Sequence, residues 1–314
     1  MKKLIILSAF IIALPCLYYG LGSVYKTEFY QAAMDYDAEQ SGLVKKSIKI
    51  SAGEMVYYEN KQPITKPSVV MLHGFTASKE NWLKFSRPFK DDYHVVIVDF
   101  MGHGESSKNL DLTFSLDNQV LWLDELITRL KIDKIHIAGN SMGGAISAMY
   151  ATQYPQKILT ATLIAPAGVH INPSVMTEFW EKGENPLIAS DVEDFYKVMD
   201  YALEKTPFIP WPVIQSLAEQ AINSKPIYEK VFEDIKPALD SDFAPVLKQI
   251  KAPTLVLWGE QDQIISYKDS EFFAENISDV KVKIWPGVGH VPMMEIPEVS
   301  AALMIEHIVV HTSI

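Results

Sequence analysis

A serine flanked by glycines follows one of the predicted strands. The string Gly139-Asn140-Ser141-Met142-Gly143-Gly144 lies directly after the apolar run 134–138 and before a helix-forming run over 145–154. At such a strand–turn–helix corner a Cβ on the glycines would clash, and the serine hydroxyl is raised above the sheet. The start of the next helix favours negative charge that develops there. The pattern predicts a nucleophile, Ser141, in preference to a phosphate-binding turn or a plain tight turn.

A nucleophilic serine needs a base, and the base needs an acid that orients it. One later strand ends in Trp258-Gly259-Glu260-Gln261-Asp262, and the last strand ends in Pro286-Gly287-Val288-Gly289-His290. Both place a polar side chain at the edge of the sheet where Ser141 lies, in one of the known chain orders of serine triads. We predict His290 as the base and Asp262 as the acid. A rival acid is Glu260, and taken singly the two residues could be a solvated turn carboxylate and a structural loop histidine.

The string His73-Gly74-Phe75-Thr76 follows another predicted strand, at 68–72. The backbone N–H groups of Phe75 and Met142 are the predicted oxyanion hole, which would donate to a carbonyl oxygen as its carbon becomes tetrahedral. His73 is predicted to order its loop. The turn over 99–106 is predicted to be structural.

Strand-like and helix-like segments alternate along most of the chain. Short alternating runs at 46–50 and 54–58 predict a hairpin. Continuous apolar runs predict buried parallel strands, and these lie at 68–72, 94–98, 134–138, 160–164 and 253–257, with a last strand at 281–285. The alternation predicts an α/β fold with a mostly parallel, doubly wound sheet. Its core would comprise residues 43–169 and 246–314.

Residues 170–245 contain no strand-like run and are predicted to form a helical cap over the carboxyl edge of the sheet, where open α/β sheets bind ligands. The insertion is apolar and aromatic, which favours a lid over an acyl-chain pocket. The alternative for any single residue is packing of the lid against the core. The substrate-binding candidates are Phe179, Trp180, Phe195, Met199, Phe208 and Trp211.

The chain begins with two lysines and an uncharged, mostly apolar run over 4–25. Twenty-two residues at about 1.5 Å each span roughly 33 Å, enough for a bilayer core. Segment 1–25 is predicted to be an uncleaved anchor with the catalytic domain on the exported side. The alternative is a cleaved signal peptide and a secreted enzyme. Residues 26–42 are predicted to form a helical linker.

The overall charge disfavours a nucleic-acid partner. The 314-residue chain carries 28 Lys and Arg against 39 Asp and Glu, a net charge of −11, whereas nucleic-acid binding requires a basic face. The single cysteine, Cys16, excludes an internal disulfide framework and a cysteine-based zinc site. The sequence makes no prediction of oligomeric state, acyl-chain length or glyceride class.

From about residue 43 to its end the chain resembles the α/β-hydrolase superfamily, and within it bacterial lipases of the Moraxella/Psychrobacter type and membrane-anchored monoacylglycerol lipases. The matching motifs are His73-Gly74-Phe75, the string 139–144, Trp258 to Gln263, Gly289 to Glu295, and cap residues 193–197 and 207–210. The resemblance implies hydrolysis of carboxylic esters by a triad of Ser141, Asp262 and His290, with no metal or organic cofactor.

Three functions are compatible with these residues. The favoured one is a membrane-tethered serine esterase that acts on acylglycerols or other medium-chain lipid esters. A second is a hydrolase that cleaves carbon–carbon bonds of ring-fission products, since Asn-Ser-Met-Gly-Gly also occurs there. Those enzymes commonly carry Trp after the catalytic histidine, where this chain has Val291. The third, least favoured, is an inactive ligand-binding homologue.

Overall fold

Eight strands form a single sheet in the computed structural model, which describes residues 19–312. The strands are β1 (Leu43–Ile50), β2 (Gly53–Asn60), β3 (Ser68–Leu72), β4 (His94–Val98), β5 (Ile135–Asn140), β6 (Ile158–Ile164), β7 (Thr254–Gly259) and β8 (Val280–Trp285). Their order across the sheet is β1-β2-β4-β3-β5-β6-β7-β8. β2 pairs antiparallel with β1 and β4, and all other neighbours are parallel. The mostly parallel sheet and its initial hairpin are confirmed.

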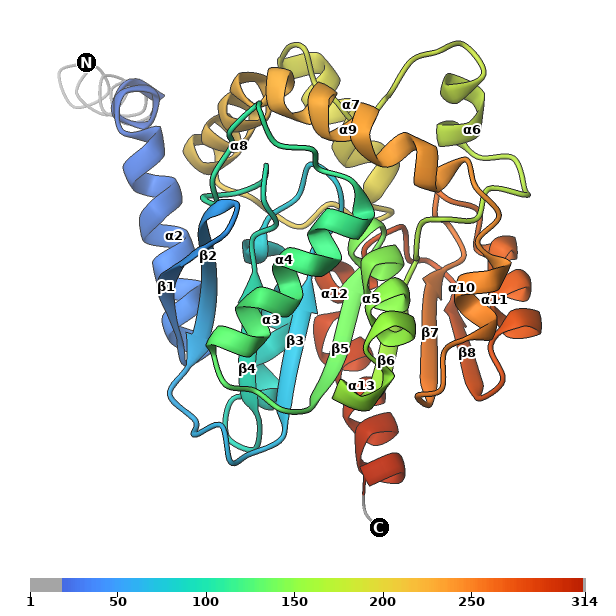
Figure 1. Ribbon diagram of the computed structural model, residues 1–314. Helices are drawn as coiled ribbons and strands as arrows, with labels where there is room; N and C mark the ends of the chain where they lie inside the picture. The colour runs from blue at the N-terminus through green and yellow to red at the C-terminus, as the bar shows by residue number, and fades with distance from the viewer. Residues whose placement is uncertain (1–18, 313–314) are drawn as a thin grey trace, which may run out of the picture.

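Helices cover both faces of this sheet (Figure 1). Those of the core are α3 (Leu83–Ser86), α4 (Leu116–Arg129), α5 (Met142–Gln153), α10 (Ala244–Lys248), α11 (Ser270–Asn276), α12 (Pro292–Glu295) and α13 (Pro297–Thr312). Helices α4, α5, α10 and α11 lie on one face, and α3, α12 and α13 lie on the other. Short 3₁₀ turns are η1 (Lys79–Trp82), η2 (Arg87–Phe89), η3 (Pro155–Lys157) and η4 (Tyr267–Asp269).

The central strands are apolar along their whole length because both of their faces are covered. In β3 every side chain is buried. Val70 and Leu72 enter the hydrophobic core on one face of the sheet, and Val69 and Met71 enter the core on the other. Because side chains pack on both faces, the strand is held firmly in place, and the loop at its carboxyl end starts from a defined position.

Four of the helices between β6 and β7 form a cap above the sheet (Figure 1). They are α6 (Val175–Trp180), α7 (Val192–Ala202), α8 (Trp211–Asn223) and α9 (Lys225–Leu239). Local signals define their starts. The Asp191 side chain accepts a hydrogen bond from the Asp194 N–H at the start of α7, and Pro210 precedes α8.

The predicted linker is helical but does not stand apart from the domain. Helix α2 (Lys26–Gln40) packs against α8 of the cap and against β1 and α3 of the core. Lys26 pairs with Glu219 of α8 at 2.9 Å, and Asp37 pairs with Arg87 of the core at 2.6 Å. These two ion pairs hold the helix against the cap at its start and against the core near its end.

Most of the predicted anchor, residues 1–18, lies outside the described part of the chain. Within residues 19–312 no helix has the length and apolar character needed to cross a bilayer. Residues 19–24 are helical and lie against the start of α8, where the Tyr19 and Trp211 ring centroids are 4.9 Å apart. A Cβ on Gly22 would lie 2.8 Å from Pro212, so this approach requires glycine.

The buried His136 of β5 makes stability depend on pH. Burial, with a smaller effect of His307, lowers the pKa of His136 to about 4. Between pH 6.5 and 4 the unfolded chain therefore binds a proton that the folded chain does not. The stabilisation from the neutral ring is present above pH 6.5 and is lost as the pH falls towards 4.

We expect His136→Gln to reduce the slope of unfolding free energy against pH by up to about 1.4 kcal/mol per pH unit in this window. Urea unfolding at several pH values between 7 and 4.5 measures the slope. Parallel curves for the variant and the original protein would contradict the prediction.

Candidate active site

Ser141 lies in a strained turn between β5 and α5. Its backbone has φ 55° and ψ −118°, which places a non-glycine residue in the positive-φ region. A Cβ on Gly139 would lie 2.0 Å from the Gly143 carbonyl oxygen, and one on Gly143 would lie 2.4 Å from that of Leu72. The Ser141 N–H donates to the Ile164 carbonyl at 3.0 Å, which ties the turn to β6. The predicted corner geometry is present.

The His290 ring lies against the carboxylate of Asp262. His290 Nδ1 is 2.7 Å from Asp262 Oδ2, and both side chains are buried. The same carboxylate accepts hydrogen bonds from Trp258 Nε1 and from the N–H groups of Ile264 and Ile265, at 2.8 to 3.0 Å. The structure therefore favours Asp262 over Glu260 as the partner of His290, because Glu260 is exposed.

The loop that carries His290 is tied to the serine turn and to the cap. The Asn140 side-chain amide donates to the His290 carbonyl and to the Ile164 carbonyl, each at 3.1 Å. The His290 N–H donates to the Ala202 carbonyl at the end of α7, at 2.9 Å. Ser141 and His290 line one cavity. Asn140 is thus a positioning residue that sequence reasoning missed, since it fills a variable position of the serine motif.

The two predicted oxyanion donors lie on either side of Ser141. Met142 begins α5, and Gly74, which precedes Phe75, is so close that a Cβ there would lie 3.2 Å from Ser141 Cβ. Within the described residues neither the Phe75 nor the Met142 N–H donates to a loop or turn acceptor. Phe75 and Ser141 line the cavity, and Met142 follows Ser141 directly.

His73 orders the start of the same loop, as predicted. Its Nε2 accepts a hydrogen bond from the Phe100 N–H at 3.1 Å, so its Nδ1 carries the proton that faces the Gly74 carbonyl at 2.7 Å. Complete burial lowers the pKa of His73 to about 4. The ring is therefore neutral at physiological pH and holds the turn through these two hydrogen bonds.

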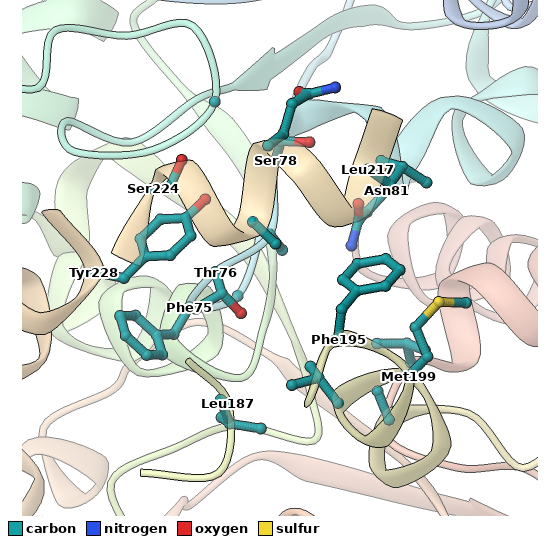
Figure 2. A pocket seen from close by; sticks show the side chains of 18 of the residues that line it. Phe75, Thr76, Ser78, Asn81, Leu187, Phe195, Met199, Leu217, Ser224 and Tyr228 are labelled. Carbon is teal, nitrogen blue, oxygen red and sulfur yellow. The ribbon is translucent and has the colours of Figure 1, made fainter. Parts of the chain in front are cut away.

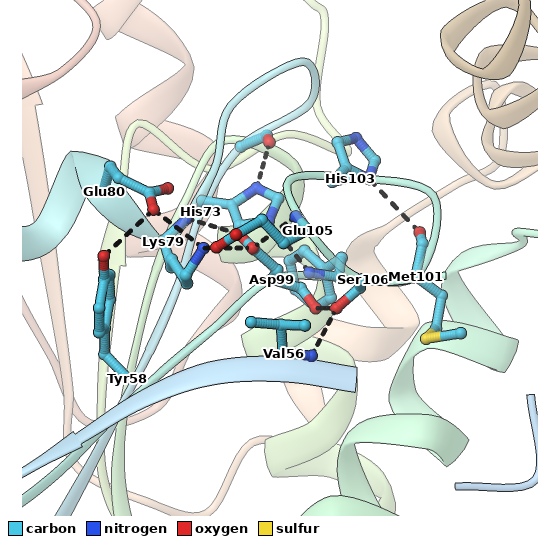
Figure 3. A network of polar contacts seen from close by, with 12 residues as sticks. Val56, Tyr58, His73, Lys79, Glu80, Asp99, Met101, His103, Glu105 and Ser106 are labelled. Atoms are coloured by element: carbon cyan, nitrogen blue, oxygen red, sulfur yellow. Dashed lines mark hydrogen bonds and ion pairs between the residues drawn. The ribbon is translucent and has the colours of Figure 1, made fainter. Parts of the chain in front are cut away.

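Lys79, at the end of the Phe75 loop, is fully buried among carboxylates (Figure 3). Its Nζ lies 2.7 Å from Asp99 Oδ2, 2.7 Å from Glu105 Oε2 and 2.9 Å from Glu80 Oε1. Its backbone N–H donates to Asp99 Oδ1 at 2.8 Å. Asp99 thus holds both the backbone and the side chain of Lys79.

This cluster explains the predicted structural turn over 99–106. The Glu105 N–H donates to Asp99 Oδ2 at 2.9 Å, and a Cβ on Gly104 would lie 2.1 Å from Asp99 Cγ. Burial opposes the charge of Lys79, but Asp99 and Glu80 more than offset that effect and raise its pKa. Sequence reasoning missed Lys79, because a lysine in a loop is usually a solvated residue.

A cavity of about 640 Å³ lies over Ser141 and His290, beneath the cap (Figure 2). The predicted substrate-binding residues Phe195 and Met199 line it. Tyr30 of α2 also lines it, and no motif or pattern in the sequence pointed to that residue. Further apolar side chains that line the cavity are Leu187, Val198, Leu203, Ile209 and Ile227.

Four predicted substrate-binding residues lie elsewhere, and the prediction is corrected for them. Phe179 lines a separate cavity beside α9. Trp180 packs against Phe232, with ring centroids 5.6 Å apart. Trp211 packs against Tyr19 of the N-terminal segment, with ring centroids 4.9 Å apart. Phe208 is 91% exposed, because in its extended segment the two neighbouring side chains point into the cavity and its own points out.

No metal centre is apparent in the part of the chain that the structure describes. Within residues 19–312, no group of three His, Cys, Asp or Glu side chains is arranged to hold a metal ion.

Comparisons with known proteins agree with this geometry. A model of the alpha/beta hydrolase fold family matches residues 67–297. Lipase 3 of Moraxella sp. (strain TA144) is 33% identical over 277 residues, which cover 84% of each chain. Monoacylglycerol lipase ABHD6 of Mus musculus is 31% identical over 265 residues, 81% of this chain and 79% of that one. The resemblance seen in the motifs is confirmed.

Solved structures extend the likeness to nearly the whole chain. The structure of a membrane phospholipase A, described as a bacterial virulence factor, superposes with a TM-score of 0.87. It is 30% identical, and the match covers 98% of this chain and 99% of that one. Helix α2 and the cap are therefore part of the shared architecture.

We expect Lys79→Met to destabilise the fold by about 3–5 kcal/mol, since it leaves the buried Asp99 carboxylate without its cation. Urea unfolding at pH 7.5 measures the loss. The matched control is Lys45→Met, which removes a second, exposed cation 2.8 Å from Glu105 and should cost less than about 1 kcal/mol. Equal losses in the two variants would refute the role of the buried pair.

Proposed function

The chain belongs to the α/β-hydrolase family and is a serine ester hydrolase, and we propose that Ser141, His290 and Asp262 are its catalytic triad. The observation that carries the proposal is the 2.7 Å contact between His290 and Asp262 at a cavity that Ser141 also lines. Its proposed substrates are acylglycerols or other medium-chain lipid esters.

In the proposed acylation step, the Ser141 hydroxyl attacks the ester carbonyl carbon while His290 Nε2 takes its proton. Asp262 accepts the hydrogen bond from Nδ1, which fixes the imidazole tautomer and stabilises the imidazolium. The carbonyl oxygen becomes negative, and the N–H groups of Phe75 and Met142 donate to it. His290 then protonates the departing alcohol, and the acyl group stays on Ser141.

In the deacylation step, His290 takes a proton from a water molecule, which attacks the acyl carbon. The bond to Ser141 Oγ then breaks, His290 returns the proton to that oxygen, and the fatty acid is released. The substrate class is supported by the apolar wall of the cavity, which Phe195, Met199 and Leu203 help to form. It is also supported by relatives that are named as lipases. The apolar run predicted as an anchor would hold such an enzyme beside its substrate.

We expect Ser141→Ala to lower kcat for p-nitrophenyl esters of short and medium acyl chains by at least about 10³-fold, because the nucleophile is lost. A fluorophosphonate probe should label the original protein at Ser141 and fail to label the variant. Unchanged thermal unfolding shows that the variant is folded. Ester hydrolysis by the variant at the rate of the unsubstituted protein would contradict the assignment of Ser141 as the nucleophile.

A carbon–carbon substrate separates the proposal from its alternative. The original protein should hydrolyse the esters and leave the absorbance of a vinylogous diketone unchanged. Faster decay of the diketone than of any ester would instead favour the carbon–carbon hydrolase.

A further inference from the structure

The cavity over Ser141 has two chemically different walls. Leu187 and Met199, which lie before and on α7, present apolar side chains on one side (Figure 2). Ser78 and Asn81, which follow β3, lie on the other, and Ser224 of the cap is a further polar lining residue. Tyr30 of α2 joins the polar residues as a lining residue. An ester with a wholly apolar alcohol would match only the apolar wall.

Tyr30, Ser78 and Asn81 are polar residues that line the cavity. Among the hydrogen bonds of residues 19–312, none involves the Tyr30 hydroxyl, the Ser78 hydroxyl or the Asn81 side-chain amide. All three are only partly exposed. Polar groups in a ligand cavity that the protein leaves unsatisfied are those that orient a ligand, because covering them with apolar atoms is costly.

Tyr30 is held in position from both ends of its helix. The Lys26–Glu219 pair, at 2.9 Å, attaches the start of α2 to the cap, and the Asp37–Arg87 pair, at 2.6 Å, attaches its end to the core. Burial raises the pKa of Tyr30, and Glu80 raises it further. The phenol is therefore neutral and offers both a donor and an acceptor to a ligand.

We propose that Tyr30, Ser78 and Asn81 form a subsite for an alcohol that carries free hydroxyl groups, and that Tyr30 is a specificity-determining residue. The inference rests on the proposed ester hydrolysis and deepens it. The acyl chain lies along the apolar wall that Leu187 and Met199 help to form beside α7, and the hydroxyl groups of the alcohol bond to the polar wall. The favoured substrates are monoacyl esters of a polyol such as glycerol.

The test compares two esters that share one acyl chain, 1-decanoylglycerol and methyl decanoate. Tyr30→Phe removes one hydroxyl and keeps the ring. We expect the ratio of kcat/KM for the glycerol ester to that for the methyl ester to fall about 3- to 10-fold, as for the loss of one hydrogen bond between neutral groups. The matched control is Tyr36→Phe, on the same helix, where the ring is 61% exposed and the ratio should not change.

Each outcome decides one question. A ratio in Tyr30→Phe equal to that of the original protein overturns the subsite, and so does an equal loss for both esters, which indicates a structural role for the hydroxyl. Neither result contradicts the proposed ester hydrolysis. If the original protein cleaves neither ester nor any p-nitrophenyl ester, the proposed function itself has failed.

Discussion

The carboxylate of Asp262 is buried, and four donors surround its two oxygens. One is the indole of Trp258, two are backbone N–H groups and the fourth is His290 Nδ1, at 2.7 to 3.0 Å. A buried charge without such partners would be too costly to keep. Because every donor comes from β7 or the loops beside it, the acid and the orientation of the imidazole depend on the correct closure of the last two strands.

The same loops connect the core to the cap. The Ala202 carbonyl accepts from the His290 N–H, and the Glu295 carboxylate accepts from the N–H groups of Gly289 and Lys205 at 2.8 and 3.0 Å. Movement of the end of α7 would therefore disturb the loop that carries the imidazole. The cap and the His290 loop are coupled by these hydrogen bonds as well as by the cavity that they share.

The sequence predicted the groups that follow the carboxyl ends of strands, since parallel strands bring those ends to one edge. Ser141, Asp262 and His290 are of this kind. It could not predict Lys79, because only the fold encloses that loop lysine with Asp99. Nor could it distinguish Phe208 from Phe195. Both are aromatic residues of the insertion, but the first alternates outward in an extended segment and the second faces inward from α7.

Helix α2 lies ahead of the region that matches the family, which begins at residue 67. Nevertheless it supplies Tyr30 to the cavity that Ser141 and His290 also line. With the proposed subsite, a change in this N-terminal helix would alter the head group that is accepted and leave Ser141, Asp262 and His290 unchanged. Comparisons limited to residues 67–297 would therefore overlook Tyr30 and the subsite proposed around it.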